Sequence, residues 1–246
     1  MEYIALFFTG MVATTLGTLA GGGGLISLPV MLLLGIPIHS AIGANKVSNT
    51  VSAFSSFLYL LKHGQISLKE SIWVIPISVI GGISGGIIAS ILSSKYLFIL
   101  AIFLLIFAFI SSFFGKDQFQ GDQKLTINKI SLPGLYSIGI YDGLFGPGQG
   151  TLQLYLFGYL KISYLRAIAY SRLATFSSCF GAAATYITTG HIIWSYTICL
   201  LLGSLSGAQV GVRIAEKLRP KIIKPLLRVV TVALIFQIIV NQLSGS

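Results

Sequence analysis

The sequence predicts an all-α, polytopic integral membrane protein, and three observations support this fold class. Hydrophobic residues make up 54% of the 246 residues and charged residues only 9%, whereas a soluble domain carries about 25% charged residues. Long windows such as 3–44 and 71–94 contain no charged side chain, and about 20 apolar residues suffice to cross a bilayer. The chain also repeats itself, with short glycine-flanked segments at matching places. We therefore expect about eight spanning helices plus short broken or re-entrant helices at two glycine-rich loops.

The internal repeat has an offset of 126 residues. Residues 17–89 align with residues 143–215 without a gap, and 18 of the 73 aligned positions are identical. An apolar composition raises chance identity, so the aligned glycines are the stronger signal: Gly17, Gly22, Gly24, Gly64, Gly81 and Gly85 align with Gly143, Gly148, Gly150, Gly190, Gly207 and Gly211. We therefore expect two homologous units: membrane repeat 1 (1–114), a polar linker (115–130) and membrane repeat 2 (131–246).

Each repeat contains five apolar segments, of which the second is short. Twelve residues of helix rise only about 18 Å, against about 30 Å for the hydrocarbon core. The first two segments are therefore expected to form an interrupted or hairpin-like unit that turns at "GGGG" (21–24) or "GPGQG" (146–150). The predicted segments are 3–20, 25–36, 41–61, 71–93 and 96–114 in the first repeat, and 131–145, 151–160, 166–188, 192–212 and 222–242 in the second.

The basic residues indicate how the two repeats are related. If each hairpin-like unit returns to its starting side, 13 lysines and arginines fall on one face of the membrane and Lys95 alone falls on the other. If the short segment only dips into the membrane, nine of these basic residues fall on one face and five on the other. The first arrangement fits the positive-inside rule better, and it predicts inverted repeats with both termini on the non-cytoplasmic side. Eight plain spans would instead give parallel halves.

The two glycine-rich loops are candidate anion sites. A broken helix leaves backbone N–H groups without partners, which lipid cannot satisfy. A loop at a helix N-terminus gathers such donors at the positive end of the helix dipole, where an anion is stabilised. The alternative is that the glycines only allow close packing or a sharp turn. The loop residues predicted to bind substrate are Gly21, Gly22, Gly23 and Gly24 in the first repeat and Gly146, Gly148, Gln149 and Gly150 in the second.

Three charged residues lie inside apolar segments, and two of them are equivalent. Lys46 and Arg172 are related by the 126-residue offset. A charge at mid-bilayer costs upwards of about 2.5 kcal/mol, so we expect both cations to line an anion path. The alternative is that both snorkel to the membrane surface or bond to free carbonyls. Asp142 is expected to form a structural ion pair with Arg172 or Lys46, and the less favoured alternative is a proton carrier.

Four polar residues accompany these cations, one position before and three positions after each. Residues three apart share a helix face, so each cation and the polar residue after it form a polar stripe. We predict that all four contribute to the substrate site, although each such residue alone is more often an interhelical hydrogen bond. They are Asn45, Asn49, Ser171 and Thr175.

No cofactor, metal or nucleic acid is expected. The three histidines fall at segment ends without cysteine or carboxylate companions, so no metal site is predicted. The sequence contains no phosphate-binding loop and no hydrolase or metalloprotease motif, and its net charge of +10 follows the segment ends. Two other hypotheses remain: a cation-coupled or cation-transporting permease that uses carbonyls of the broken helices, and, less favoured, a membrane-embedded enzyme.

Two stretches resemble the TauE/SafE family of membrane transporters, also called the toluene-sulfonate-uptake permease family. They are "GTLAGGGGLISLPVMLLLGIPIHSAIGANKVSN" (17–49) and "GIYDGLFGPGQGTLQLYLFGYLKISYLRAIAYSRLAT" (139–175). The resemblance extends over nearly the whole chain. It implies passive or ion-coupled movement of sulfur-containing anions such as sulfite and sulfonates. Ala44 stands where the family commonly has threonine, and Arg172 stands where it commonly has lysine, so the substrate need not be sulfite.

These observations together predict a secondary transporter of small anions. The resemblance implies a multi-pass protein of the plasma membrane, here expected to be a prokaryotic inner membrane. The predicted partners are the anionic substrate and the lipid bilayer, and the sequence leaves open whether the chain forms a homo-oligomer. An arginine fork favours planar or tetrahedral oxyanions, but it does not choose among carboxylate, sulfonate and sulfite.

Overall fold

The computed structural model describes residues 2–21, 23–93 and 123–217, together with a few isolated positions between 95 and 119. Gly22, most of the predicted segment 96–114 and all of segment 222–242 lie outside the described residues. Every regular element in the described part is a helix: α1 (Glu2–Ala20), α2 (Gly24–Leu33), α3 (Ile38–Lys62), α4 (Leu68–Ser71), α5 (Val74–Ile91), α7 (Ser131–Leu144), α8 (Gln149–Tyr159), α9 (Tyr164–Thr188) and α10 (Trp194–Ala215).

The helical class is confirmed, and the described helices begin and end within three residues of the predicted segments. The predicted segment 71–93 is not one continuous helix, because a turn separates α4 from α5. Within the described ranges, three stretches are long and apolar enough to cross a membrane: Glu2–Ala20, Leu68–Ile91 and Trp194–Ala215. The count of about eight spans stays a prediction.

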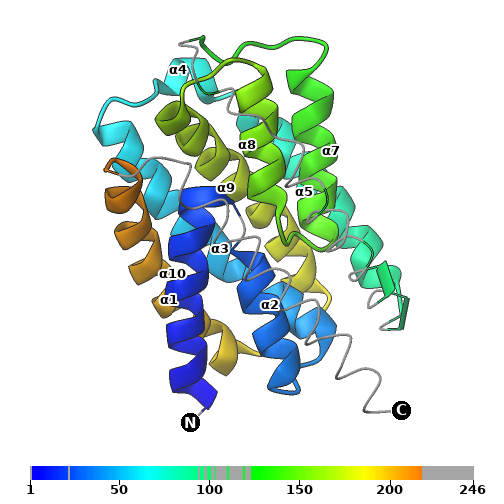
Figure 1. Cartoon of the computed structure of the whole chain (residues 1–246). Coiled ribbons are helices and arrows are strands. Elements are labelled where there is room, and N and C mark those ends of the chain that lie inside the picture. Colours follow the sequence, from blue (N-terminus) through cyan, green and yellow to red (C-terminus); the bar gives the residue numbers. More distant parts are fainter. Residues whose placement is uncertain are drawn as a thin grey trace.

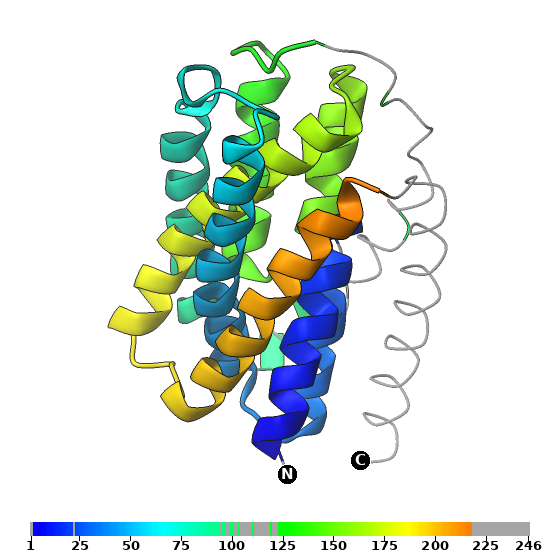
Figure 2. The same ribbon diagram turned by 90° about the vertical axis from the view of Figure 1, so that its left-hand side faces the viewer.

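Two helical hairpins enter the bundle from opposite ends. In the views of Figures 1 and 2, α1 runs up from the N-terminus and α2 runs back down, whereas α7 runs down and α8 runs back up. The chain reverses at Gly21, whose φ is +83°, and at Gly146, whose φ is +98°. Such left-handed backbone favours glycine because it has no Cβ atom. Both hairpin tips lie near the middle of the bundle (Figure 1).

The long helices α3 and α9 form the centre of the bundle and pack against each other. α10 packs on α3 and on α1, and α5 packs on α9 and on α7, so each hairpin lies against helices from the other half of the chain. The central helices also carry most of the buried polar side chains. Because their neighbours shield them from lipid, they tolerate polar residues that a lipid-facing helix would not.

Small residues allow the outer helices to approach the hairpins closely. A Cβ atom on Gly203 of α10 would lie 1.9 Å from the carbonyl oxygen of Phe7 on α1. On the other side of the bundle, a Cβ atom on Gly85 of α5 would lie 2.1 Å from the carbonyl oxygen of Ile140 on α7. Helices in membranes associate through such small-residue contacts because no hydrophobic force drives apolar helices together in lipid.

A pair of glycine-to-alanine substitutions tests this packing. We expect Gly203→Ala to destabilise the protein by at least about 2 kcal/mol, because the new methyl group must push backbone atoms apart. Gly134→Ala is the control, since its Cβ would meet only the movable end of Leu156 at 3.0 Å and alanine favours helix by about 1 kcal/mol. Thermal unfolding in detergent measures the stability of both variants. An equal loss of stability in the two would contradict the packing argument.

Candidate functional site

The tips of the two hairpins touch through their backbones. A Cβ atom on Gly21 would lie 2.1 Å from the carbonyl carbon of Gly150, and one on Gly24 would lie 3.0 Å from the Cα atom of Pro147. Only glycine fits the first of these contacts. Gly21 and Gly150 therefore serve close packing in this structure, which is the alternative role that the sequence left open for the loops.

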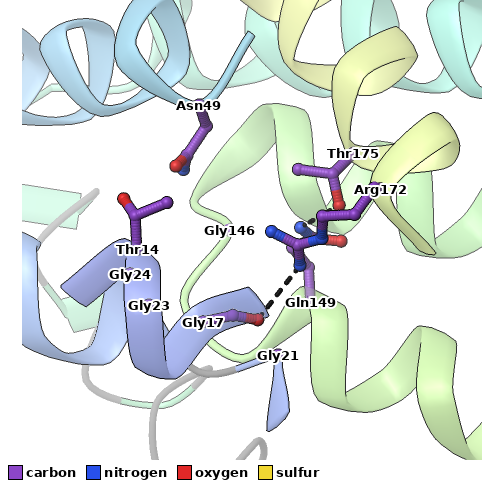
Figure 3. Close-up of a pocket in the computed structure, with 10 residues that line it drawn as sticks. All are labelled: Thr14, Gly17, Gly21, Gly23, Gly24, Asn49, Gly146, Gln149, Arg172 and Thr175. Atoms are coloured by element: carbon purple, nitrogen blue, oxygen red, sulfur yellow. Dashed lines mark hydrogen bonds between the residues drawn. The ribbon is translucent and has the colours of Figure 1, made fainter. Parts of the chain in front are cut away.

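A small cavity lies beside this contact (Figure 3). Its volume is about 20 Å³, room for about one water molecule. Eight of its lining residues are among the predicted site residues, whereas Thr14 and Gly17 of α1 were not in the predicted set. The lining residues are Thr14, Gly17, Gly21, Gly23, Gly24, Asn49, Gly146, Gln149, Arg172 and Thr175.

Arg172 supplies a buried positive charge at the cavity wall. Its side chain is only 5% exposed, and one guanidinium nitrogen, Nη2, donates to the carbonyl oxygen of Gly17 at 3.1 Å (Figure 3). Its Nε has no hydrogen-bond partner, and no described carboxylate forms an ion pair with it. A buried cation without a counter-charge is costly, so the cavity is a place where a negative charge is stabilised.

Gln149 adds a second polar group that has an unused hydrogen-bonding atom. Its Nε2 donates to the Thr175 hydroxyl at 2.8 Å, as Figure 3 shows, while its Oε1 is buried without a partner. Thr14 and Asn49 face each other on the opposite side of the cavity (Figure 3). The hydroxyls and the Asn49 amide of the cavity wall can donate to oxygen atoms of a solute, whereas the unpaired Oε1 of Gln149 can only accept a hydrogen bond.

The N-termini of two helices face the same cavity. α2 begins at Gly24 and α8 begins at Gln149, and both residues line the cavity. The amides of Gly24 and Leu25 donate to no backbone carbonyl of the described residues. Helix N-termini carry partial positive charge and free N–H donors. The N-termini of α2 and α8 therefore add to the positive electrostatic potential that Arg172 creates in the cavity.

Lys46 has a different environment from its repeat equivalent. Its Nζ lies 2.7 Å from Oδ1 of Asp142, and both side chains are at most 2% exposed. The other carboxylate oxygen, Oδ2, accepts from the hydroxyl of Ser178 at 2.5 Å and lies 3.3 Å from Sγ of Cys179. Asp142 therefore pairs with Lys46 and not with Arg172. Neither Lys46 nor Asp142 lines the cavity, but both lie directly against Gly146, which does.

The other predicted residues connect each central helix to its own hairpin. Asn45 donates to the hydroxyl of Ser27 at 2.9 Å, and Ser171 donates to Oε1 of Gln153 at 2.7 Å. These two contacts are equivalent under the 126-residue offset. Asn45, Ser171, Gly148 and Gly150 do not line the cavity. Asn45 and Ser171 bond to the hairpins, Gly150 packs against Gly21, and Gly148 caps α8 with a φ of +81°.

Two hairpins that meet at a buried polar cavity inside an apolar helical bundle are typical of secondary membrane transporters. The family model "Sulfite exporter TauE/SafE" matches residues 6–238 of the chain. The protein therefore belongs to the TauE/SafE family of membrane transporters, and the resemblance found in the sequence is confirmed.

Curated relatives agree with this assignment. The chain is 33% identical over 243 residues to probable membrane transporter protein ORF9 of Sinorhizobium sp, covering 96% of this chain and 92% of the relative. It is 29% identical to a probable membrane transporter protein of Haemophilus influenzae, covering 96% and 94%, and 26% identical to the probable membrane transporter protein YfcA of Escherichia coli, covering 92% and 85%. No solved structure matches the chain.

Removing one member of the buried ion pair tests its structural role. We expect Lys46→Met to destabilise the protein by about 3–5 kcal/mol, because Asp142 would be left as a buried charge without a partner. The double variant Lys46→Met/Asp142→Asn removes both charges and should recover most of that loss. Thermal unfolding of the purified variants measures the effect. A double variant no more stable than Lys46→Met would show that charge pairing is not what the two residues contribute.

Proposed function

We propose that this protein is a secondary transporter that carries a small anion across the plasma membrane through the cavity between the hairpin tips. The observation that carries the proposal is the buried guanidinium of Arg172, which lacks a counter-charge among the described residues and lines the same cavity as two helix N-termini. An anion bound there would neutralise the cation and could accept from the amide of Gly24, which donates to no backbone carbonyl of the described residues.

The chemistry of the cavity favours an oxyanion. A guanidinium presents two parallel N–H groups to a planar or tetrahedral oxyanion, and Nε of Arg172 is available for such a contact. The description of the family model names sulfite. A sulfite-type or sulfonate-type anion, or another small organic anion, is therefore the substrate class that we propose.

The arrangement of the helices suits alternating access by inverted repeats. α3 (Ile38–Lys62) and α9 (Tyr164–Thr188) have the same length and bounds that differ by 126 residues, and they run in opposite directions in Figures 1 and 2. The cavity has room for about one water molecule, so a larger anion requires the two hairpin tips to move apart. Rocking of one repeat against the other would open the cavity first to one side and then to the other.

The charge distribution supports a cytoplasmic location for the end of the bundle where α3 and α10 end. Lysines and arginines at this end outnumber those at the opposite end, where Lys95 follows α5. The positive-inside rule then places the N-terminus outside the cytoplasm. The described basic residues at the proposed cytoplasmic end are Lys62, Lys69, Lys124, Lys129, Lys161, Arg166, Arg213 and Lys217.

A cation permease is the second candidate, and the Lys46–Asp142 ion pair argues against it. A cation site would require the buried carboxylate of Asp142, but this group is already bound to Lys46. A membrane-embedded enzyme gains no support from the relatives, whose names describe transporters. Anion transport is therefore the function that the geometry supports best.

A transport assay in proteoliposomes tests the role of Arg172. We expect Arg172→Gln to reduce uptake of sulfite or methanesulfonate at least about tenfold, because the neutral side chain cannot compensate the buried negative charge. The matched control is Arg213→Gln, which removes an exposed arginine at the end of α10 and should transport like the wild type. Equal uptake by Arg172→Gln and wild type would refute the proposed site, and uptake of a cation alone would favour the second candidate.

Labelling with a membrane-impermeant maleimide in intact cells tests the orientation. We expect Thr189→Cys, in the exposed turn after α9, to react in intact cells, because it lies at the same end as the N-terminus (Figure 1). Ser67→Cys, in the exposed turn before α4, should react only after the cells are permeabilised. Labelling of Ser67→Cys alone in intact cells would reverse the proposed orientation.

A further inference from the structure

The charges of the described residues around the cavity add up to one excess positive charge. Arg172 contributes a cation at the cavity wall, and the Lys46–Asp142 pair behind Gly146 contributes one charge of each sign. The other described carboxylates are remote from the cavity, at helix ends: Glu2 and Glu216 accept from tyrosine hydroxyls, and Glu70 pairs with Lys124. We propose that the cavity selects a monovalent anion over a divalent one, and that Asp142 sets this valence. The inference rests on the proposed anion site.

The ion pair is close enough to the cavity to take part in its charge balance. A Cβ atom on Gly146 would lie 2.2 Å from Nζ of Lys46 and 2.7 Å from Oδ1 of Asp142, and Gly146 itself lines the cavity. All three charged side chains are at most 5% exposed. Water screens such buried charges only weakly, so each of them acts on a solute in the cavity.

A monovalent anion brings the sum of these charges to zero, whereas a divalent anion leaves one negative charge uncompensated. An uncompensated charge in a buried, lipid-surrounded site is unfavourable. The carboxylate of Asp142, which is held in place by Lys46 and Ser178, is the negative charge that lowers this sum to one, so the charge balance favours the monovalent anion.

The excess charge arises from a difference between the two repeats. The position equivalent to Asp142 in the first repeat is Leu16, so the first hairpin brings no carboxylate to the central cations. A carboxylate in both hairpins would cancel the two cations, and a carboxylate in neither would leave two positive charges. The single aspartate, Asp142, is therefore the residue that leaves the cavity with one excess positive charge.

Binding of methanesulfonate and sulfate to the purified protein tests the inference. Both are tetrahedral sulfur oxyanions, and they differ by one charge at neutral pH. At constant ionic strength, we expect wild-type protein to bind methanesulfonate at least about tenfold more tightly than sulfate, measured by calorimetry or by ligand-dependent thermal stabilisation. Similar affinities for the two anions in the wild type would overturn the inference without any variant.

Two variants then change the charge in steps. Asp142→Asn raises the sum to two positive charges and should shift the preference toward sulfate at least about tenfold. Lys46→Met/Asp142→Asn returns the sum to one and should restore the preference for methanesulfonate, even though both residues of the pair are altered. If the ratio of the two affinities stays constant across all three proteins, Asp142 does not set the valence.

The readouts separate this inference from the proposed function. If both anions bind equally well and Arg172→Gln abolishes their binding, the anion site stands and only the valence selection fails. If neither anion binds the folded wild-type protein, the proposed oxyanion site and the inference built on it are both wrong. Size-exclusion profiles and unfolding temperatures without anion identify any variant that does not fold.

Discussion

The backbone contact between the two hairpin tips is the constraint on which the rest of the site depends. Gly21 and Gly150 approach so closely that no side chain fits between them, and this contact brings the N-termini of α2 and α8 to one cavity. Any larger residue at the contact would separate the tips and move the two helix dipoles away from the shared space. The glycine-rich loops thus position the backbone donors, in addition to permitting the turns.

Each central helix uses its cation to hold the hairpin of the other half. Lys46 on α3 reaches Asp142 on α7, and Arg172 on α9 reaches the carbonyl of Gly17 on α1. The geometry is thus similar in the two halves, but the partners differ in charge. A carboxylate neutralises Lys46, whereas a neutral carbonyl leaves the charge of Arg172 available. The two cations occupy equivalent positions under the 126-residue offset, and the aspartate in place of Leu16 gives them different partners.

Much of this arrangement could be predicted from the sequence, because glycines and charges interrupt an otherwise apolar chain at the helix ends. The 126-residue offset also picked out Lys46 and Arg172 as equivalent positions, and both are buried on the central helices. The choice of Lys46 over Arg172 as the partner of Asp142 was not predictable, because sequence spacing does not give distances between helices. Thr14 was not found either, since a single hydroxyl in an apolar helix commonly bonds to its own backbone.

The partner of Arg172 also bears on how a transporter could release its cargo. A site that must bind and release in each cycle gains little from a guanidinium already neutralised by a carboxylate, because the anion would have to displace a charged competitor. The carbonyl of Gly17 orients the side chain through one hydrogen bond at 3.1 Å and leaves Nε free. Because Gly17 belongs to α1 and Arg172 to α9, movement of one half against the other changes this contact directly. The displacement that we propose to open the cavity would therefore also alter the contact of Arg172, the cation that we propose to hold the anion.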